Sequence, residues 1–207
     1  MTDQRSDTEA KPSEPAAGNS SNAASPKKES SGYVEHVVQV LTEPDRFFDS
    51  GHRSDRSEAM IDLAVFATAY FLAAVVARAF GFSGFDLDFG HFIDGFKSLL
   101  VLALPLAGLV FAWSWQGGRA GGQETPGFYV EKLGGALLLP ALLLVLAIVL
   151  DMIDARIHSW FRSMAIAFVY IGVFAMTYAY AAPGKLKTAA IFTAGFFIAY
   201  RLLVLLF

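Results

Sequence analysis

Two carboxylates and an imidazole stand close together near residue 151 and form the one acidic-plus-imidazole cluster of the sequence. Asp151 and Asp154 are three residues apart, so they share one face of a helix that extends that far, and His158 follows one turn later. Groups of this kind can bind a cation or act as general acid and base on a lipid. They also match a solvated rim that is ion-paired with Arg156 and Arg162. We favour the rim, because carboxylates at the ends of membrane spans are common without catalysis.

The patterns of established metal, phosphate and catalytic sites do not occur in the sequence. Asp86, Asp88, His91 and Asp94 add ligand-type side chains on the same predicted side, but neither a His-Glu-x-x-His pair nor an EF-hand spacing is present. The glycine-rich stretch 117–122 lacks the GxxxxGK[ST] pattern and is interpreted as a flexible loop. There is no cysteine, so a thiol nucleophile is excluded. We therefore predict no catalytic, cofactor-binding or metal-binding residue, and no enzyme.

Three charged residues lie inside otherwise apolar stretches, where a charge is costly and therefore a functional hypothesis. Asp62 is about one turn into the first stretch, where it is interfacial or pairs with a Lys or Arg at the cytoplasmic surface. Arg78 and Arg201 lie near the far ends of their stretches and can snorkel to the surface. In a transporter they would line a water path near kinks at Pro105 and Pro140. The candidate functional residues are therefore Asp62, Arg78, Asp151, Asp154, His158 and Arg201.

Five apolar segments carry these residues. Of the 207 residues, 55% are hydrophobic and only 17% are charged, which is unlike a soluble globular chain. A bilayer core of about 30 Å requires about 20 apolar residues in a helix. The sequence predicts an all-α membrane fold, a bundle of five transmembrane helices within residues 59–207. The predicted spans are about 59–80, 98–115, 133–150, 160–182 and 188–207.

The residues before the first span divide into two parts. Residues 1–32 contain almost no large apolar side chain, so we predict a disordered cytoplasmic tail. Residues 33–58 include a short amphipathic helix, with Glu35, His36, Gln39 and Thr42 between its apolar positions. Those apolar positions recur at helical spacing and are Val34, Val37, Val38 and Leu41. This segment can lie in the membrane interface or pack against the helix bundle.

Lysine and arginine residues near the span ends predict the orientation. With the N-terminus inside, the cytoplasmic flanks hold Arg46, Arg53, Arg56, Arg119, Lys132, Lys185 and Lys187. The opposite flanks hold only Arg78, Lys97, Arg156 and Arg162. We expect a protein of the bacterial inner membrane with a cytoplasmic N-terminus and a periplasmic C-terminus. Trp113, Trp115 and Trp160 stand at span ends, where tryptophan favours the membrane interface.

The segment before the first span resembles the Yip1 family. Members of that family have an apolar segment, then a proline and an aromatic pair; here residues 40–48 read Val-Leu-Thr-Glu-Pro-Asp-Arg-Phe-Phe. The five-span pattern and the placement of Pro105, Gly108 and Pro140 are also similar. The resemblance covers residues 34–207. Eukaryotic members are linked to vesicle trafficking and small GTPases, while for bacterial members the resemblance implies a fold more than an activity.

Three functions follow from these observations. The first is a non-enzymatic, multi-pass membrane protein of Yip1-like type that organises membrane partners. The second is a small transporter or channel subunit that acts as an oligomer, and the third is a membrane-embedded enzyme acting on lipid. The expected partners are the lipid bilayer and a membrane protein or further copies of the chain. The mild net charge of −3 gives no reason to expect nucleic acid.

Overall fold

A computed structural model describes residues 32–43, 56–81, 84–119, 125–153 and 157–207. The predicted tail lies outside these residues, as does the Pro44–Phe48 part of the Yip1-like motif. The described residues form α1 (Tyr33–Thr42), α3 (Arg56–Ala79), β1 (Phe80–Gly81), β2 (Gly84–Phe85), α4 (Phe89–Arg119), α5 (Pro126–Met152), α6 (His158–Met176), the π-helix η1 (Thr177–Ala181) and α7 (Leu186–Leu206). The two short strands pair antiparallel, with Phe80 opposite Phe85.

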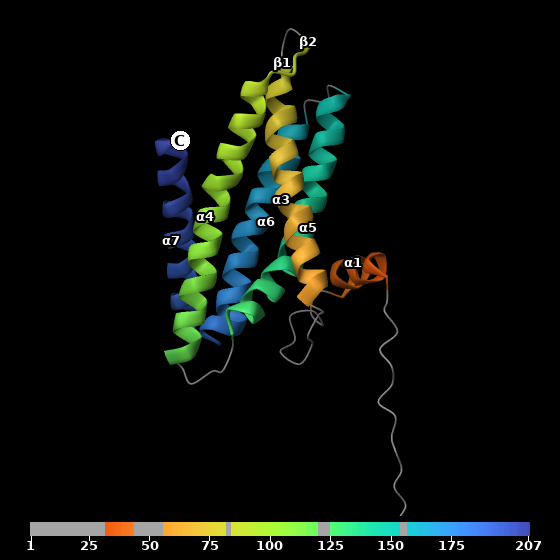
Figure 1. Ribbon diagram of the computed structural model, residues 1–207. Helices are drawn as coiled ribbons and strands as arrows, with labels where there is room; N and C mark the ends of the chain where they lie inside the picture. The colour runs from red at the N-terminus through yellow and green to blue at the C-terminus, as the bar shows by residue number, and fades with distance from the viewer. Residues whose placement is uncertain (1–31, 44–55, 82–83, 120–124, 154–156) are drawn as a thin grey trace, which may run out of the picture. The chain divides into compact units, whose positions relative to one another are not determined.

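The prediction of an all-α bundle with five candidate spans and a short preceding helix is confirmed. Within the described ranges, five helical segments are long and apolar enough to cross a membrane, and they contain between 21 and 30 residues each. The short α1 precedes them. Figure 1 shows the long helices side by side, with α1 at one end and β1 and β2 at the other. We call these the α1 end and the hairpin end.

Helix α5 lies at the centre of the bundle. It packs most extensively on α3 and then on α6, while α4 reaches both α3 and α7. Half of the most apolar stretch of α5 is buried, against 11% for α7. The core is apolar and spans all five long helices. Its largest fully buried apolar or aromatic side chains include Trp113, Tyr129, Leu137, Leu144, Val169 and Met176.

The helices extend beyond the apolar segments from which they were predicted. Helix α4 begins at Phe89 instead of 98, and α5 begins at Pro126 instead of 133. The extra turns carry polar residues, which a hydropathy pattern excludes but a helical backbone accepts. Pro126 suits the first helical position, because its missing N–H would have no partner there. A tight turn at Pro183 and Gly184 separates η1 from α7, with Gly184 at φ 69°.

Candidate functional site: the α1–α3 junction and the polar ends of the bundle

Asp62 is the most deeply buried carboxylate among the candidate residues. It lies in the second turn of α3, and only 1% of it is exposed. Glu58 is four residues earlier, so both carboxylates project from the same face of the helix. That face meets α1, which packs beside α5. The sequence of α3 therefore presents two acids to the short helix.

Helix α1 supplies the partners of these carboxylates. The Tyr33 hydroxyl donates a hydrogen bond to Asp62 Oδ1 at 3.0 Å. The His36 ring lies between the two acids, with Nε2 3.0 Å from Asp62 Oδ2 and Nδ1 3.5 Å from Glu58 Oε2. A doubly protonated ring donates to both carboxylates, whereas a neutral ring donates to one only. Asp62 therefore pairs with a histidine and a tyrosine, and not with the Lys or Arg that the sequence led us to expect.

The environment of Tyr33 changes its acidity. Burial, followed by the hydrogen bond and the negative charge of Asp62, raises the pKa of Tyr33 from 10.0 to about 12. The phenol therefore stays neutral at physiological pH and remains a donor to the carboxylate. Together, Tyr33, His36, Glu58 and Asp62 form a polar cluster that joins α1 to α3, which we call the α1 latch.

Helix α1 has one buried face and one exposed face. The sequence left open whether its apolar residues meet the membrane or the bundle. In the structure His36 and Val40 are buried, and Val40 and Val37 pack with Leu138 of α5. Val34 and Val38 remain 75% and 52% exposed. Figure 1 shows α1 running across the direction of the long helices, an orientation that suits a helix in the membrane interface.

Arg78 lies at the opposite end of α3 and is exposed there. Its Nη1 donates to the Ala74 carbonyl at 2.9 Å, and its Nη2 donates to Ser98 Oγ at 3.4 Å. Its Nε is 3.6 Å from Asp94 Oδ2, and Lys97 Nζ is 4.0 Å from Asp94 Oδ1. Arg78 thus joins a polar group that also contains residues of α4.

Asp151 is held by residues of α6. Arg162 Nη2 donates to Asp151 Oδ2 at 2.8 Å, and His158 Nδ1 is 3.2 Å from Asp151 Oδ1. Asp151 is 5% exposed, so the pair is closely packed. Asp154 and Arg156 lie outside the described residues. The predicted ion-paired rim is therefore present for Asp151 and Arg162.

Asp88, just before the start of α4, has a structural role. Asp88 Oδ1 accepts a hydrogen bond from the Phe89 N–H at 2.6 Å, and the Asp88 N–H donates to His91 Nδ1 at 3.1 Å. These bonds satisfy backbone groups where the helix begins. Across the described ranges, no group of three His, Asp or Glu side chains is arranged to hold a metal ion.

Arg201 is separate from the other charged candidates. Its guanidinium lies 5.4 Å from the centre of the Phe197 ring, one turn earlier on α7, and its side chain is exposed. Asp62 and Arg78 are sixteen residues apart on one helix, which is about 24 Å. The three intramembrane charges therefore do not converge within one copy of the chain.

Two buried polar features were missed in the sequence. Lys132, which the sequence presents only as a charge that flanks a span, is fully buried, with its Nζ 5.8 Å from the centre of the Tyr180 ring. Trp113 is also fully buried, which corrects its assignment to the membrane interface. Its Nε1 donates to Thr177 Oγ1 at 2.9 Å, where α6 passes into the π-helix η1. Trp115 and Trp160 are exposed, as an interface position requires.

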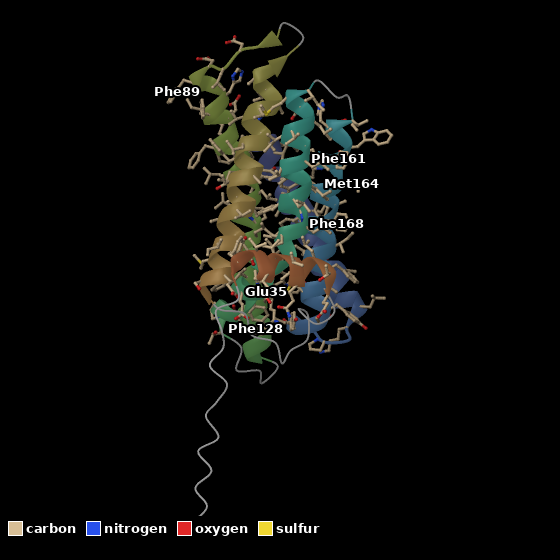
Figure 2. The ribbon with its side chains drawn as sticks, turned by 90° about the vertical axis from the view of Figure 1, so that its right-hand side faces the viewer. Glu35, Phe89, Phe128, Phe161, Met164 and Phe168 are labelled. Carbon is tan, nitrogen blue, oxygen red and sulfur yellow. The ribbon has the colours of Figure 1, made fainter. Side chains whose placement is uncertain are left out.

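Figure 2 marks the two ends of the bundle. Glu35 of α1 and Phe128 of α5 lie at the α1 end, while Phe89 lies at the hairpin end. The five long apolar helices decide the class of the molecule. The chain is a multi-pass membrane protein. Comparisons with protein-family models, curated proteins and solved structures give no match for it.

Proposed function

We propose that this membrane protein organises partner proteins within the bilayer and catalyses no reaction. The observation that carries the proposal is a cavity of about 360 Å³ between α3, α4 and α5. All of its lining side chains are apolar. They are Leu63, Phe66, Ala67, Leu99, Leu102, Ala103, Leu106, Ala107, Val110, Val130, Leu133 and Leu137. Ala103 and Ala107 are exposed, so the cavity reaches the side of the bundle and forms a lateral groove.

The lateral groove suits an apolar transmembrane helix of a partner protein. Its walls carry alanines at positions 67, 103 and 107, and the last two are four residues apart on α4. Small side chains at this spacing let helix backbones approach closely, which is how membrane helices associate. The absence of charge among its lining residues favours an apolar occupant and disfavours a polar solute.

The Yip1-like assignment belongs to this proposal. It is supported by an interfacial α1 that precedes five long helices, in the order that the resemblance implies. We extend the proposal to the bacterial inner membrane, with α1 on the cytoplasmic side. In this arrangement, α1 and the lateral groove would give a partner an interfacial contact and an intramembrane contact.

Site-specific photo-crosslinking in cells tests the groove. A photoreactive residue is placed at Ala107, inside the groove, or at Leu104, which is exposed on α4 but does not line it. We expect one protein adduct at Ala107 that is absent at Leu104 and lost when Ala103→Phe fills the groove. Mass spectrometry identifies the adduct. Adducts with lipid alone, or equal adducts at both positions, would exclude the proposal.

The buried α1 latch favours a second candidate, an oligomeric transporter or channel subunit. Titratable groups within a span are typical of proton pathways, and Asp62 and Glu58 of α3 both contact His36 of α1. Reconstituted protein would then carry protons or ions across liposomes, and Asp62→Asn would reduce the flux. A liposome assay without flux of any tested ion would remove this candidate.

A further inference from the structure

A second cavity lies at the hairpin end, between α3, α4 and α7. Its volume is about 230 Å³. Unlike the lateral groove, it combines charged, hydroxyl and apolar side chains. It is lined by Tyr70, Arg78, Asp94, Lys97, Ser98, Val101, Tyr200, Val204 and Phe207. We call it the hairpin-end pocket.

The side chains that line the hairpin-end pocket carry a net positive charge. Arg78 and Lys97 are two cations, and Asp94 is the one carboxylate among the lining side chains. The separations of 3.6 and 4.0 Å are long, and all three side chains are 41–48% exposed, so these ion pairs are weak. Lys97 Nζ is too far from Asp94 for a short hydrogen bond. The cations therefore keep donor capacity for an anion.

Arg78 also has hydrogen-bond donors to spare. A guanidinium has five N–H groups. Among the described residues, three are directed at the Ala74 carbonyl, Ser98 Oγ and Asp94 Oδ2. Two further N–H groups, one on each terminal nitrogen, remain for a ligand. Arginine binds phosphate oxygens with such paired donors.

The polarity of the pocket changes with depth. Tyr70 is eight residues before Arg78 on α3 and thus about 12 Å further from the hairpin end. Val101 lies one turn below Lys97 on α4. Tyr70 and Tyr200 both line this deeper part. Cations stand at the mouth, and mainly aromatic and aliphatic side chains lie below.

We propose that the hairpin-end pocket binds an anionic phospholipid. The phosphate would lie against Arg78 and Lys97 with the Ser98 hydroxyl beside it, and the first part of an acyl chain would follow Val101 and Val204. Basic pockets between transmembrane helices bind anionic headgroups in this way. The two cationic side chains at the mouth favour a lipid with net negative charge over a zwitterionic one.

Lipid titration of the full-length protein tests the assignment. The protein is purified in detergent, stripped of lipid, and titrated with phosphatidylglycerol, phosphatidylcholine or glycerol phosphate, with binding followed by native mass spectrometry. Replacing both cations in the variant Arg78→Gln/Lys97→Gln should weaken phosphatidylglycerol binding roughly tenfold or more. Arg201→Gln is the matched control, because it removes an exposed cation of α7 that does not line the pocket.

A second variant tests the pocket without changing its charge. Val204 is 46% exposed, so Val204→Trp can be accommodated while its ring occupies the pocket. It should weaken lipid binding, and thermal unfolding of the lipid-free variants should match wild type. The assignment would be overturned if phosphatidylcholine bound as tightly as phosphatidylglycerol, or if Arg201→Gln weakened phosphatidylglycerol binding as much as Arg78→Gln/Lys97→Gln. Displacement of the bound lipid by equimolar glycerol phosphate would also overturn it. The last result would indicate a site for a soluble phosphate ester.

Discussion

Asp62 is stabilised by contacts to both of its carboxylate oxygens. Its two oxygens meet the Tyr33 hydroxyl and His36 Nε2, each at 3.0 Å. Charged groups lose their hydration when they are buried, so the partners must replace it. Removal of either side of such a pair leaves the other buried with one partner fewer. The α1 latch is therefore expected to be a main contribution to the attachment of α1 to the bundle.

Replacement of Asp62 should destabilise the protein strongly. We expect Asp62→Ala to lower the free energy of unfolding by about 3 kcal/mol, because His36 loses its buried carboxylate. Asp94→Ala is the control: it breaks two exposed ion pairs and should cost less than about 1 kcal/mol. Denaturant titration in detergent measures both. Equal losses in the two variants would show that burial of Asp62 contributes nothing.

Tyr33 should ionise only in strongly alkaline solution. Its pKa is higher in the folded protein, at about 12, than the 10.0 of an ordinary tyrosine. The folded state therefore binds this proton more tightly, and the resulting stabilisation is complete below pH 10.0 and lost as the pH rises through about 12. The difference between the ultraviolet titration curves of wild type and Tyr33→Phe reports this residue separately from the other six tyrosines. A midpoint near 10.0 would contradict the contact with Asp62.

The sequence identifies Asp62 but not its partners, for a physical reason. An acid within an apolar stretch is conspicuous, because its burial is costly. Its histidine is 26 residues earlier, on a separate helix, and periodicity carries no information across such a break. Lys132 was missed similarly, because a lysine at a span end normally reaches water, whereas here aromatic rings cover it.

At the scale of elements, the α1 latch should keep α1 folded against the bundle. The short helix contacts the bundle through His36 and Val40, and isolated helices of ten residues are marginal in water. We expect His36→Leu to increase hydrogen exchange throughout Tyr33–Thr42. Glu35→Leu, at an exposed position of the same helix, is the matched control and should leave exchange unchanged. Similar exchange in both variants would mean that the apolar contacts alone hold α1.

Helices α3 and α5 approach closely at one glycine. A Cβ atom on Gly134 would lie 2.7 Å from the Ala59 carbonyl oxygen and 3.3 Å from its Cα, so backbone would have to move. This close approach explains how α3 and α5 form the most extensive helix pair of the bundle. Gly108 on α4 differs, because nothing lies within 4 Å of its Cβ position.

The two glycines should respond oppositely to alanine. Gly134→Ala should lower the free energy of unfolding by about 1–3 kcal/mol, because α3 and α5 are forced apart. Gly108→Ala should be neutral or raise it by up to about 1 kcal/mol, since alanine is the better helix former. Thermal unfolding in detergent compares the two. A loss at Gly108 as large as that at Gly134 would indicate a general cost of side chains, unrelated to helix packing.

At the scale of the whole bundle, hydropathy predicts the number of spans well and their ends less well. Apolar runs near 20 residues leave a helix as the only backbone that satisfies its hydrogen bonds in lipid. The polar turns from Phe89 onward in α4 are helical for another reason, because they continue a helix that the apolar residues have already established. The packing of α5 at the centre depends on side-chain shape, which a count of apolar residues does not contain.

An odd number of spans places α1 and the last residue at opposite ends of the bundle, as Figure 1 shows for the described chain. The absence of cysteine makes this topology directly testable, because a single introduced thiol has no background. We expect an impermeant thiol reagent to label Ser159→Cys, exposed at the hairpin end, in intact bacterial cells with a permeabilised outer membrane. Lys185→Cys, exposed at the α1 end, should react only after lysis. Labelling of Lys185→Cys alone would invert the orientation that the lysine and arginine distribution predicts, and labelling of both in intact cells would contradict a span between them.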